Sequence, residues 1–199
     1  MLMLISPGIQ DWVTAAKVYR RFVSRPGADH IASRISLAHL AAVLRTFDCK
    51  RVLEVGAGIG TITYLLLQQS REVIALEHNG FCQHQLELNI PTNLRSRLRL
   101  VSDEAEIDGV FDLVIIDGKI PPRTHRFLTP GTICFAEGSR RHTIARFQNR
   151  AQSLGLRFPM EKQRPLVALR VRMRGLSIKV FRKKTCRIGV VESSAVDAA

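Results

Sequence analysis

The chain has 199 residues, of which 46% are apolar and 24% charged, and these proportions are typical of one globular domain. No apolar stretch reaches the roughly 18 residues of a membrane span, and the first residues lack the basic segment of a secretory signal. The four cysteines are widely spaced without a CxxC pair, which disfavours a zinc site or a disulfide framework and favours a reducing compartment, the cytoplasm.

The net charge of +13 is distributed unevenly along the chain. Between Arg140 and Arg187 there are fifteen Lys and Arg residues and a single acidic residue, whereas residues 1–139 carry fifteen basic and fourteen acidic residues. Such a basic segment is either a solvated surface or a binding site for a partner that carries phosphate groups. The charge pattern therefore leaves a nucleic-acid partner open for residues 140–187.

The predicted elements begin with two helices and continue as alternating strands and helices. Helical periodicity covers residues 9–24, RPGADH at 25–30 ends it, and a second helix is predicted over 36–47 with Ser36 as its N-cap. The alternation that follows is typical of a parallel sheet covered on both faces. Its predicted strands are 51–56, 72–77, 98–102, 111–118 and 131–138, and its predicted helices are 61–70, 80–90 and 139–155.

Two further strands are predicted in LVALRVRMRGLSIKVFRKK, at residues 166–184. Arginines there alternate with apolar residues, and a link at Gly175 separates the two halves, which favours an antiparallel hairpin. The last residues, 188–199, are predicted to form a frayed tail.

The stretch VLEVGAGIGTIT, at residues 52–63, places a strand, a glycine turn and a helix in succession, as α/β proteins do where they bind dinucleotides and similar ligands. The NAD-type pattern is GxGxxG, but its sixth position is Thr61 here, and the spacing is GxGxG. Glu54, two residues before the first glycine, would repel a pyrophosphate and suits a ligand with an ammonium group. S-adenosylmethionine has an ammonium group, a sulfonium charge and no phosphate. The three glycines are Gly56, Gly58 and Gly60.

Acidic residues also follow the next three predicted strands. Glu77 ends the second strand, where it can accept from both ribose hydroxyls, and His78 beside it can flank the adenosine. Asp103 follows the third strand at the expected adenine edge, and Asp117 ends the fourth near the reactive end of the cleft. Because the carboxyl ends of parallel strands share one edge, these acids and Glu54 would line one crevice. Exposed surface roles remain open for Glu77, His78 and Asp103.

At these positions the sequence resembles the class I S-adenosylmethionine-dependent methyltransferases over roughly residues 36–182. The resemblance implies an α/β fold, a Rossmann-like, doubly wound and mostly parallel seven-stranded sheet with an antiparallel terminal hairpin and helices on both faces. It makes Glu54 and the three glycines, with Thr61, the site of the methionine end, Glu77 the ribose partner and Asp103 the adenine partner. The domain that binds S-adenosylmethionine would cover 36–187, and residues 1–35 would form a helical lid or substrate wall by analogy.

Two family patterns for the acceptor side are incomplete in this chain. IDGKIPPR places its prolines too late for the Asn/Asp-Pro-Pro-aromatic motif of base-methylating relatives and lacks the aromatic residue. In the catechol-type, metal-dependent members, an acid after the fourth strand binds a divalent ion with an Asp-Asn pair after the fifth. Asp117 matches the first ligand, but the fifth strand is followed by Glu137 and no such pair, so we expect no metal.

The form of FDLVIIDG is nearest to that of small-molecule O-methyltransferases. We expect direct in-line methyl transfer to an oxygen of a small or anionic acceptor, with Lys119 and Arg123 as anion-holding candidates. An RNA-directed methyltransferase, or a nucleic-acid-binding protein of this fold, is the alternative. The candidate catalytic residues are Asp117, Lys119 and His142, with His125 and Glu137 as further acid–base candidates.

Overall fold

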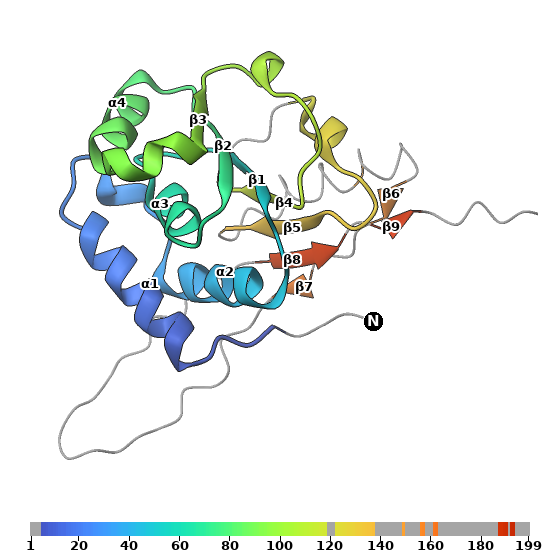
Figure 1. Ribbon diagram of the computed structural model, residues 1–199, viewed down its shortest axis with the longest axis horizontal. Coiled ribbons are helices and arrows are strands. Elements are labelled where there is room, and N and C mark those ends of the chain that lie inside the picture. Colours follow the sequence, from blue (N-terminus) through green and yellow to red (C-terminus); the bar gives the residue numbers. More distant parts are fainter. Residues whose placement is uncertain are drawn as a thin grey trace, which may run out of the picture.

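The computed structural model describes residues 5–118 and 122–137, together with Asn149 and short strands between 156 and 193. From the first to the fifth strand, strands alternate with α-helices or short 3-10 helices along the chain (Figure 1). The helices are α1 (Ile9–Phe22), α2 (Arg34–Thr46), α3 (Thr61–Gln68) and α4 (Gly80–Asn89). The strands are β1 (Arg51–Val55), β2 (Glu72–Leu76), β3 (Leu98–Val101), β4 (Leu113–Ile116) and β5 (Ile133–Ala136).

These five strands are parallel neighbours in the order β3-β2-β1-β4-β5. The chain therefore winds outward to one side of β1 through β2 and β3, and then to the other side through β4 and β5. Doubly wound sheets of this kind bind ligands at the carboxyl ends of the strands, where the winding changes direction. The predicted α/β, Rossmann-like parallel sheet is confirmed, and it places that switch point between β1 and β4.

Strand pairing continues beyond β5 with segments from the end of the chain. Strand β8 (Arg187–Val190) pairs antiparallel with β5, and the two-residue strand β7 (Glu161–Lys162) pairs antiparallel with β8. A separate pair is formed by β6 (Leu156–Arg157) and β9 (Glu192–Ser193). Residues 188–190, predicted to belong to the tail, are thus paired with β5. The predicted hairpin at 166–184 lies outside the described residues, so the hairpin and the seven-stranded sheet that it would complete stay predictions.

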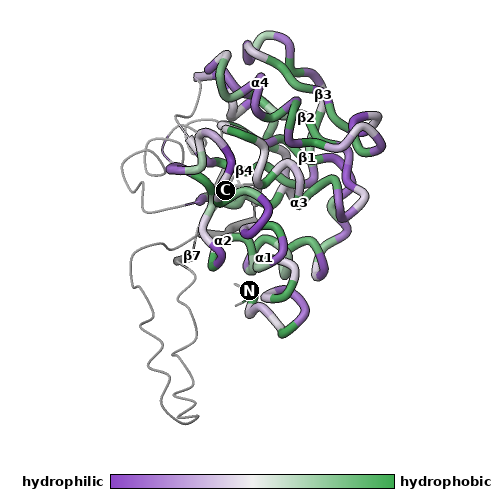
Figure 2. The backbone as a smooth tube through the Cα atoms, turned by 90° about the vertical axis from the view of Figure 1, so that its left-hand side faces the viewer, coloured by the Kyte–Doolittle hydropathy of each residue, from purple (hydrophilic) through white to green (hydrophobic). Residues whose placement is uncertain are grey.

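Side chains on the two faces of the sheet form two apolar layers, because successive residues of a strand point in opposite directions. One layer packs beneath the four helices and includes Val52, Ile115 and Phe135. The other includes Val55 and Ile116 and is closed, within the described part of the chain, by loop residues and the short 3-10 helix η4 (Thr124–Phe127). The hydrophobic colour of the central strands in Figure 2 corresponds to these layers. The sheet is thus packed on both faces, and the loops that follow its strands lie at its carboxyl edge.

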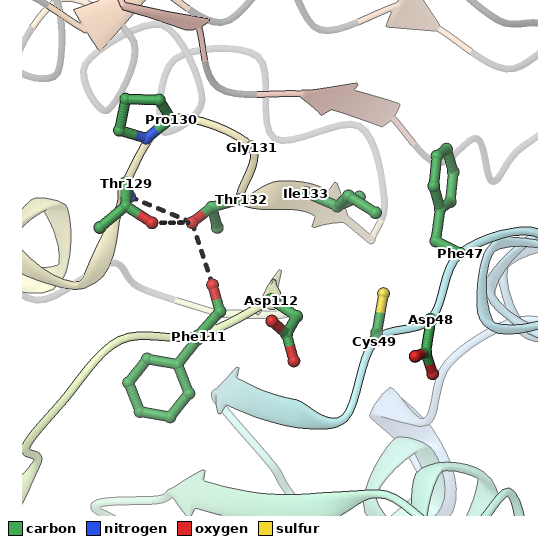
Figure 3. A pocket seen from close by; sticks show the side chains of 10 residues that line it. All are labelled: Phe47, Asp48, Cys49, Phe111, Asp112, Thr129, Pro130, Gly131, Thr132 and Ile133. Atoms are coloured by element: carbon green, nitrogen blue, oxygen red, sulfur yellow. Dashed lines mark hydrogen bonds between the residues drawn. The ribbon is translucent and has the colours of Figure 1, made fainter.

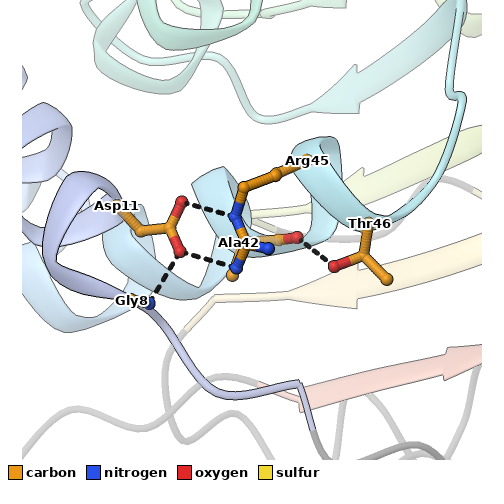
Figure 4. A network of polar contacts seen from close by, with 5 residues as sticks. All are labelled: Gly8, Asp11, Ala42, Arg45 and Thr46. Atoms are coloured by element: carbon orange, nitrogen blue, oxygen red, sulfur yellow. Dashed lines mark hydrogen bonds and ion pairs between the residues drawn. The ribbon is translucent and has the colours of Figure 1, made fainter.

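Helix α1 is fixed to α2 by a buried carboxylate (Figure 4). Asp11 is 4% exposed, accepts a hydrogen bond from the Gly8 amide at 2.8 Å and pairs with Nη2 of Arg45 at 2.9 Å. One side chain thus caps the start of α1 and links it to the end of α2. The packing of α1 along α2 also fixes the start and the end of the connecting segment, 23–33, which runs to the carboxyl edge of the sheet.

Candidate functional site

A cavity of about 490 Å³ opens at the carboxyl ends of β1, β2 and β4. Its volume lies within the range of about 300–1,000 Å³ typical of small-molecule pockets. Three of the segments that line it follow these strands: the glycine turn, the start of α4 with Glu77 and His78, and the pair Asp117–Gly118. The fourth is the segment 27–32 between α1 and α2. The cavity therefore lies at the switch point.

The glycine turn after β1 needs glycine for two different reasons. Gly56 has a φ of +86°, and a Cβ there would lie 2.5 Å from the carbonyl oxygen of Asp117, so only glycine lets the turn pass the end of β4. Gly58 has a φ of +55°, and a Cβ there would meet nothing within 4 Å. Gly60 packs against Leu86 of α4 instead and does not line the cavity. The first two glycines thus form the floor of the cavity.

Glu77 links the end of β2 to the glycine turn. Its Oε2 accepts a hydrogen bond from the Gly58 amide at 2.7 Å, and its Oε1 accepts one from the Asn79 amide at 2.9 Å. His78 beside it is held by a contact of 2.6 Å between its Nδ1 and the carbonyl oxygen of Ser102. Carboxylate oxygens have further lone pairs, so Glu77 can still accept from a ligand that lies on the turn.

Glu54 lies beneath this floor and is 1% exposed. Thr63 of α3 donates to its Oε2 at 2.6 Å, whereas its Oε1 has no partner within the described residues. The pKa of Glu54 is raised to about 8, mainly by burial; the hydrogen bond from Thr63 opposes this rise, and the charges of Asp117 and Glu77 add to it. A buried oxygen without a partner is costly. The same holds for Oγ1 of Thr61, which lines the cavity and has no partner in the described structure.

The strand register explains why three of the predicted acids come together. Glu54 is level with Ala75 on one side and Ile115 on the other. Glu77 comes two residues after Ala75, and Asp117 two residues after Ile115. Because side chains two residues apart on a strand point the same way, all three carboxylates lie on the same face of the sheet, with Glu77 and Asp117 nearer the carboxyl ends of the strands and the cavity. No Lys or Arg is found among the described residues that line the cavity. The site therefore carries negative charge although the whole chain is strongly basic.

Asp103 takes a local role. It does not line the cavity, and its Oδ1 accepts a hydrogen bond from the Ala105 amide at 2.7 Å as the cap of the 3-10 helix η3 (Glu104–Glu106). Glu106 reciprocates by accepting from the Asp103 amide at 2.9 Å. A short polar side chain after a strand commonly bonds to the nearby backbone in this way. Its predicted contact with adenine stays a prediction.

The other candidates for the acceptor side are not among the described residues that line the cavity. Some of them make structural contacts elsewhere, and others lie outside the described residues. Glu137 is buried and accepts from the Ser33 amide at 3.3 Å and the Ser36 hydroxyl at 3.1 Å, so it connects the end of β5 to the start of α2. The amide of Arg123 donates to Glu104 at 2.9 Å, away from the cavity lining. His125 lies in η4. Lys119 and His142 lie outside the described residues.

Gly27 and residues 29–32 line the cavity; their local pattern predicts only the end of a helix, whereas the family resemblance predicts a lid or substrate wall over 1–35. A Cβ on Gly27 would lie 2.8 Å from Ile59 and 3.0 Å from Phe81, so this segment passes close over the glycine turn and α4. It includes the 3-10 helix η1 (Ala28–His30) and reaches Glu137 at Ser33. The position of this segment over the glycine turn depends on tertiary packing, and Gly27 is the one residue in it whose type is required by that close approach. Phe81 and Cys82, which also line the cavity, have no polar motif that marks them.

A second cavity, of about 350 Å³, lies at the opposite, amino ends of β1, β4 and β5 (Figure 3). Asp112 there accepts from the amides of Lys50 and Arg51, both at 2.8 Å, and the Thr132 hydroxyl donates to the Phe111 carbonyl at 3.0 Å. Burial raises the pKa of the nearby Cys49 thiol to about 11. These polar groups connect the starts of neighbouring strands, so the cavity at the carboxyl edge is the candidate site.

No family model and no curated protein sequence matches the chain. Among solved structures, it is similar to the Podospora anserina methyltransferase PaMTH1 with bound SAH, at a TM-score of 0.58 and 14% identity over 90% of this chain and 87% of that chain. The chain has the class I methyltransferase fold. The glycopeptide N-methyltransferase MtfA gives a TM-score of 0.54 at 14% identity, covering 81% of this chain and 92% of its own.

The O-methyltransferase TomG from Streptomyces achromogenes, involved in tomaymycin synthesis and solved with SAM, is also similar. Its TM-score is 0.52 at 15% identity, over 96% of this chain and 93% of that chain. Both oxygen and nitrogen methyltransferases thus share this fold, so the fold does not determine the acceptor atom. Within the described residues, no helix is long and apolar enough to cross a membrane. In the same residues, no three His, Cys, Asp or Glu side chains gather as a metal site would require.

Proposed function

We propose that the protein is an S-adenosylmethionine-dependent methyltransferase that methylates an oxygen atom of a small molecule. The observation that carries this proposal is an acidic cavity with two buried oxygens that have no partner among the described residues: Oγ1 of Thr61, which lines the cavity, and Oε1 of Glu54, the residue before the lining residue Val55. They fit a ligand that brings hydrogen-bond donors and positive charge, and S-adenosylmethionine has both an ammonium and a sulfonium group. When bound, it supplies an activated methyl group.

The residues around the cavity have separate roles toward this ligand. Glu54 and Thr61, with Gly56 and Gly58, hold the methionine end, and the free amides at the start of α3 favour its carboxylate. Glu77 accepts from the ribose hydroxyls while it still holds the Gly58 amide. His78 flanks the adenosine and Asp103 accepts from the adenine amino group. Asp117 adds negative charge near the sulfonium. After methyl transfer, S-adenosylmethionine would become S-adenosylhomocysteine.

The segment 1–35 is the proposed substrate wall, and its support is the lining of the cavity by residues 27–32. Residues 36–187 are proposed as the domain that binds the methyl donor. An anionic acceptor receives no support from the described lining, which has no Lys or Arg. Lys119 and His142 stay catalytic candidates, and Asp117 is the described one. We propose a cytoplasmic location on the chain's cysteine pattern.

Calorimetric titration tests the proposed cofactor. We expect S-adenosylmethionine to bind and NAD to give no heat, and Glu54→Gln to weaken S-adenosylmethionine at least tenfold because it removes the charge that faces the ammonium group. Glu104→Gln is the matched control, since it changes another buried acid that lies away from the cavity. Tight binding of NAD, or no binding of S-adenosylmethionine, would contradict the proposal.

Modification or binding of RNA is a second candidate, and the fifteen basic residues between Arg140 and Arg187 favour it. Binding through phosphates predicts an affinity that falls steeply with salt, because each contact releases a condensed counterion. Titration of a short single-stranded RNA at 50 and 200 mM salt checks this expectation. A salt-independent affinity, or no binding at the lower salt, would remove this candidate.

A further inference from the structure

The mouth of the cavity carries two titratable side chains from η1, Asp29 and His30. The segment that contains them begins against Ile59 and Phe81 at Gly27 and ends at Ser33, whose amide donates to Glu137 after β5. It therefore crosses the carboxyl edge of the sheet from α4 to β5. Both side chains are exposed and both line the cavity.

His30 differs from Glu77 and His78 of the lining in having no side-chain partner among the described residues. In the described structure its ring makes no hydrogen bond or ion pair, and the same holds for Asp29. Glu77, in contrast, binds two backbone amides, and the His78 ring is held by the Ser102 carbonyl. An imidazole that faces a ligand cavity without a partner is free to accept a proton, and histidine is the side chain best suited to this at neutral pH.

The charge of the lining restricts what can reach His30. Its described charged side chains at neutral pH are Asp29, Glu77 and Asp117, and an anionic acceptor would be repelled by all three. Apolar surface is present as well, because Phe81, which lines the same cavity, is 52% exposed and Ile31 lies beside His30. An uncharged compound with an apolar body fits these surroundings. A hydroxyl group on it would need a base to take its proton during methylation, whereas a carboxylate would not.

We propose, on the basis of the proposed function, that His30 contacts the methyl acceptor and takes its proton, and that the acceptor is an uncharged hydroxyl compound. As the hydroxyl oxygen bonds to the methyl carbon, the carbon–sulfur bond breaks and its electron pair stays on sulfur. The hydroxyl proton moves to the His30 imidazole and from there to water at the open mouth. The products are a methyl ether and an uncharged thioether.

Three aromatic probes of similar size test the acceptor class with the full-length protein. Phenol is uncharged at neutral pH, benzylamine is cationic and benzoate is anionic. With methyl-labelled S-adenosylmethionine, we expect label on phenol and none on benzoate. Label on benzoate or benzylamine in preference to phenol, or on none of the three, would overturn the inference. If S-adenosylmethionine itself fails to bind in calorimetry, the proposed function fails instead.

The role of His30 is tested with His30→Gln and the control His84→Gln, which changes an exposed histidine of α4 outside the cavity. We expect His30→Gln to lower turnover of phenol by about 10²–10⁴-fold, the usual contribution of a general base, with unchanged S-adenosylmethionine affinity. His84→Gln should leave both unchanged. Turnover within threefold of the wild type in His30→Gln would overturn the assignment.

A binding measurement checks the same contact without turnover. Ring C–H signals of the histidines are followed by NMR in protein saturated with S-adenosylhomocysteine, and His30→Gln identifies the signal of His30. We expect phenol to shift this signal and leave that of His84 in place. The same spectra show that both variants are folded. A His30 signal that phenol does not move would overturn the proposal.

Discussion

At the scale of single residues, Glu54 holds a proton that the unfolded chain would release. Its pKa is raised from 4.5 to about 8, mainly by burial. Between these two values the folded state binds more protons than the unfolded state, so the free energy of unfolding decreases as the pH rises. Glu54→Gln removes this contribution. We expect the variant to gain stability relative to the wild type from pH 4.5 to 8, as measured by urea denaturation, and a pH-independent difference would contradict the assignment.

The same residue predicts a proton change on binding. A ligand ammonium beside Glu54 favours the carboxylate, so binding of S-adenosylmethionine at a pH below about 8 should release a proton. Calorimetry in buffers of different ionisation enthalpy measures this release. We expect up to one proton for the wild type at pH 7 and a smaller number for Glu54→Gln. Equal proton release by the two proteins would mean that another group titrates.

Two glycines of the turn predict different costs for the same substitution. In Gly56→Ala the new Cβ would lie 2.5 Å from the Asp117 carbonyl oxygen at a φ of +86°. In Gly58→Ala the φ is +55° and nothing lies within 4 Å. We expect both to lose about 1–2 kcal/mol from the left-handed backbone, and Gly56→Ala to lose about 1–3 kcal/mol more through the clash. Equal losses in urea denaturation would refute this difference.

At the scale of elements, the Asp11 carboxylate connects α1 to α2. Asp11→Ala removes the cap of α1 and leaves Arg45 without its partner, so we expect a loss of about 1–2 kcal/mol. Asp48→Ala is the control, because Asp48 is 75% exposed and pairs with Lys50 and Arg71 only at 3.5 and 3.7 Å. Such surface pairs contribute about 0–1 kcal/mol. Thermal unfolding of both variants checks the order.

The sequence predicts the elements well where local pattern and burial agree. The strands β1, β2 and β4 are mostly apolar, and the alternation of side chains along them is what brings Glu54, Glu77 and Asp117 to one face. The fourth strand begins later than predicted, because Asp112 binds the amides of Lys50 and Arg51 and Phe111 packs in the apolar layer that includes Val55 and Ile116. Those two contacts are tertiary, and strand periodicity does not contain them.

Two parts of the candidate site could not be predicted from local pattern. Asp103 follows a strand as Glu77 does, but the amides of η3 lie nearer to it than the cavity does, and it binds there. His30 lies 26 residues before Gly56, the first glycine of the turn, and only the packing of α1 on α2 brings it to the same edge of the sheet. Side-chain capping and long-range packing thus determine which residues outside the glycine motif lie at the cavity.

At the scale of the whole molecule, the class I fold predicts stabilisation by its ligand. At 100 times its dissociation constant, a ligand that binds only the folded state adds about 2.7 kcal/mol. For a chain of this size, each kcal/mol raises the Tm by about 2–4 °C. We therefore expect S-adenosylhomocysteine to raise the Tm by about 5–11 °C and NAD to leave it unchanged. An equal rise with NAD would indicate a dinucleotide site.

The segment 27–33 is supported at both ends, by Ile59 and Phe81 near Gly27 and by Glu137 at Ser33. None of these anchors belongs to a strand of the parallel sheet. The segment can therefore be exchanged for another of equal length while the sheet and the glycine turn keep their sequence. A short stretch of chain with its own anchors would let one methyl-donor site serve different acceptors, so directed changes of acceptor preference should begin at residues 28–32.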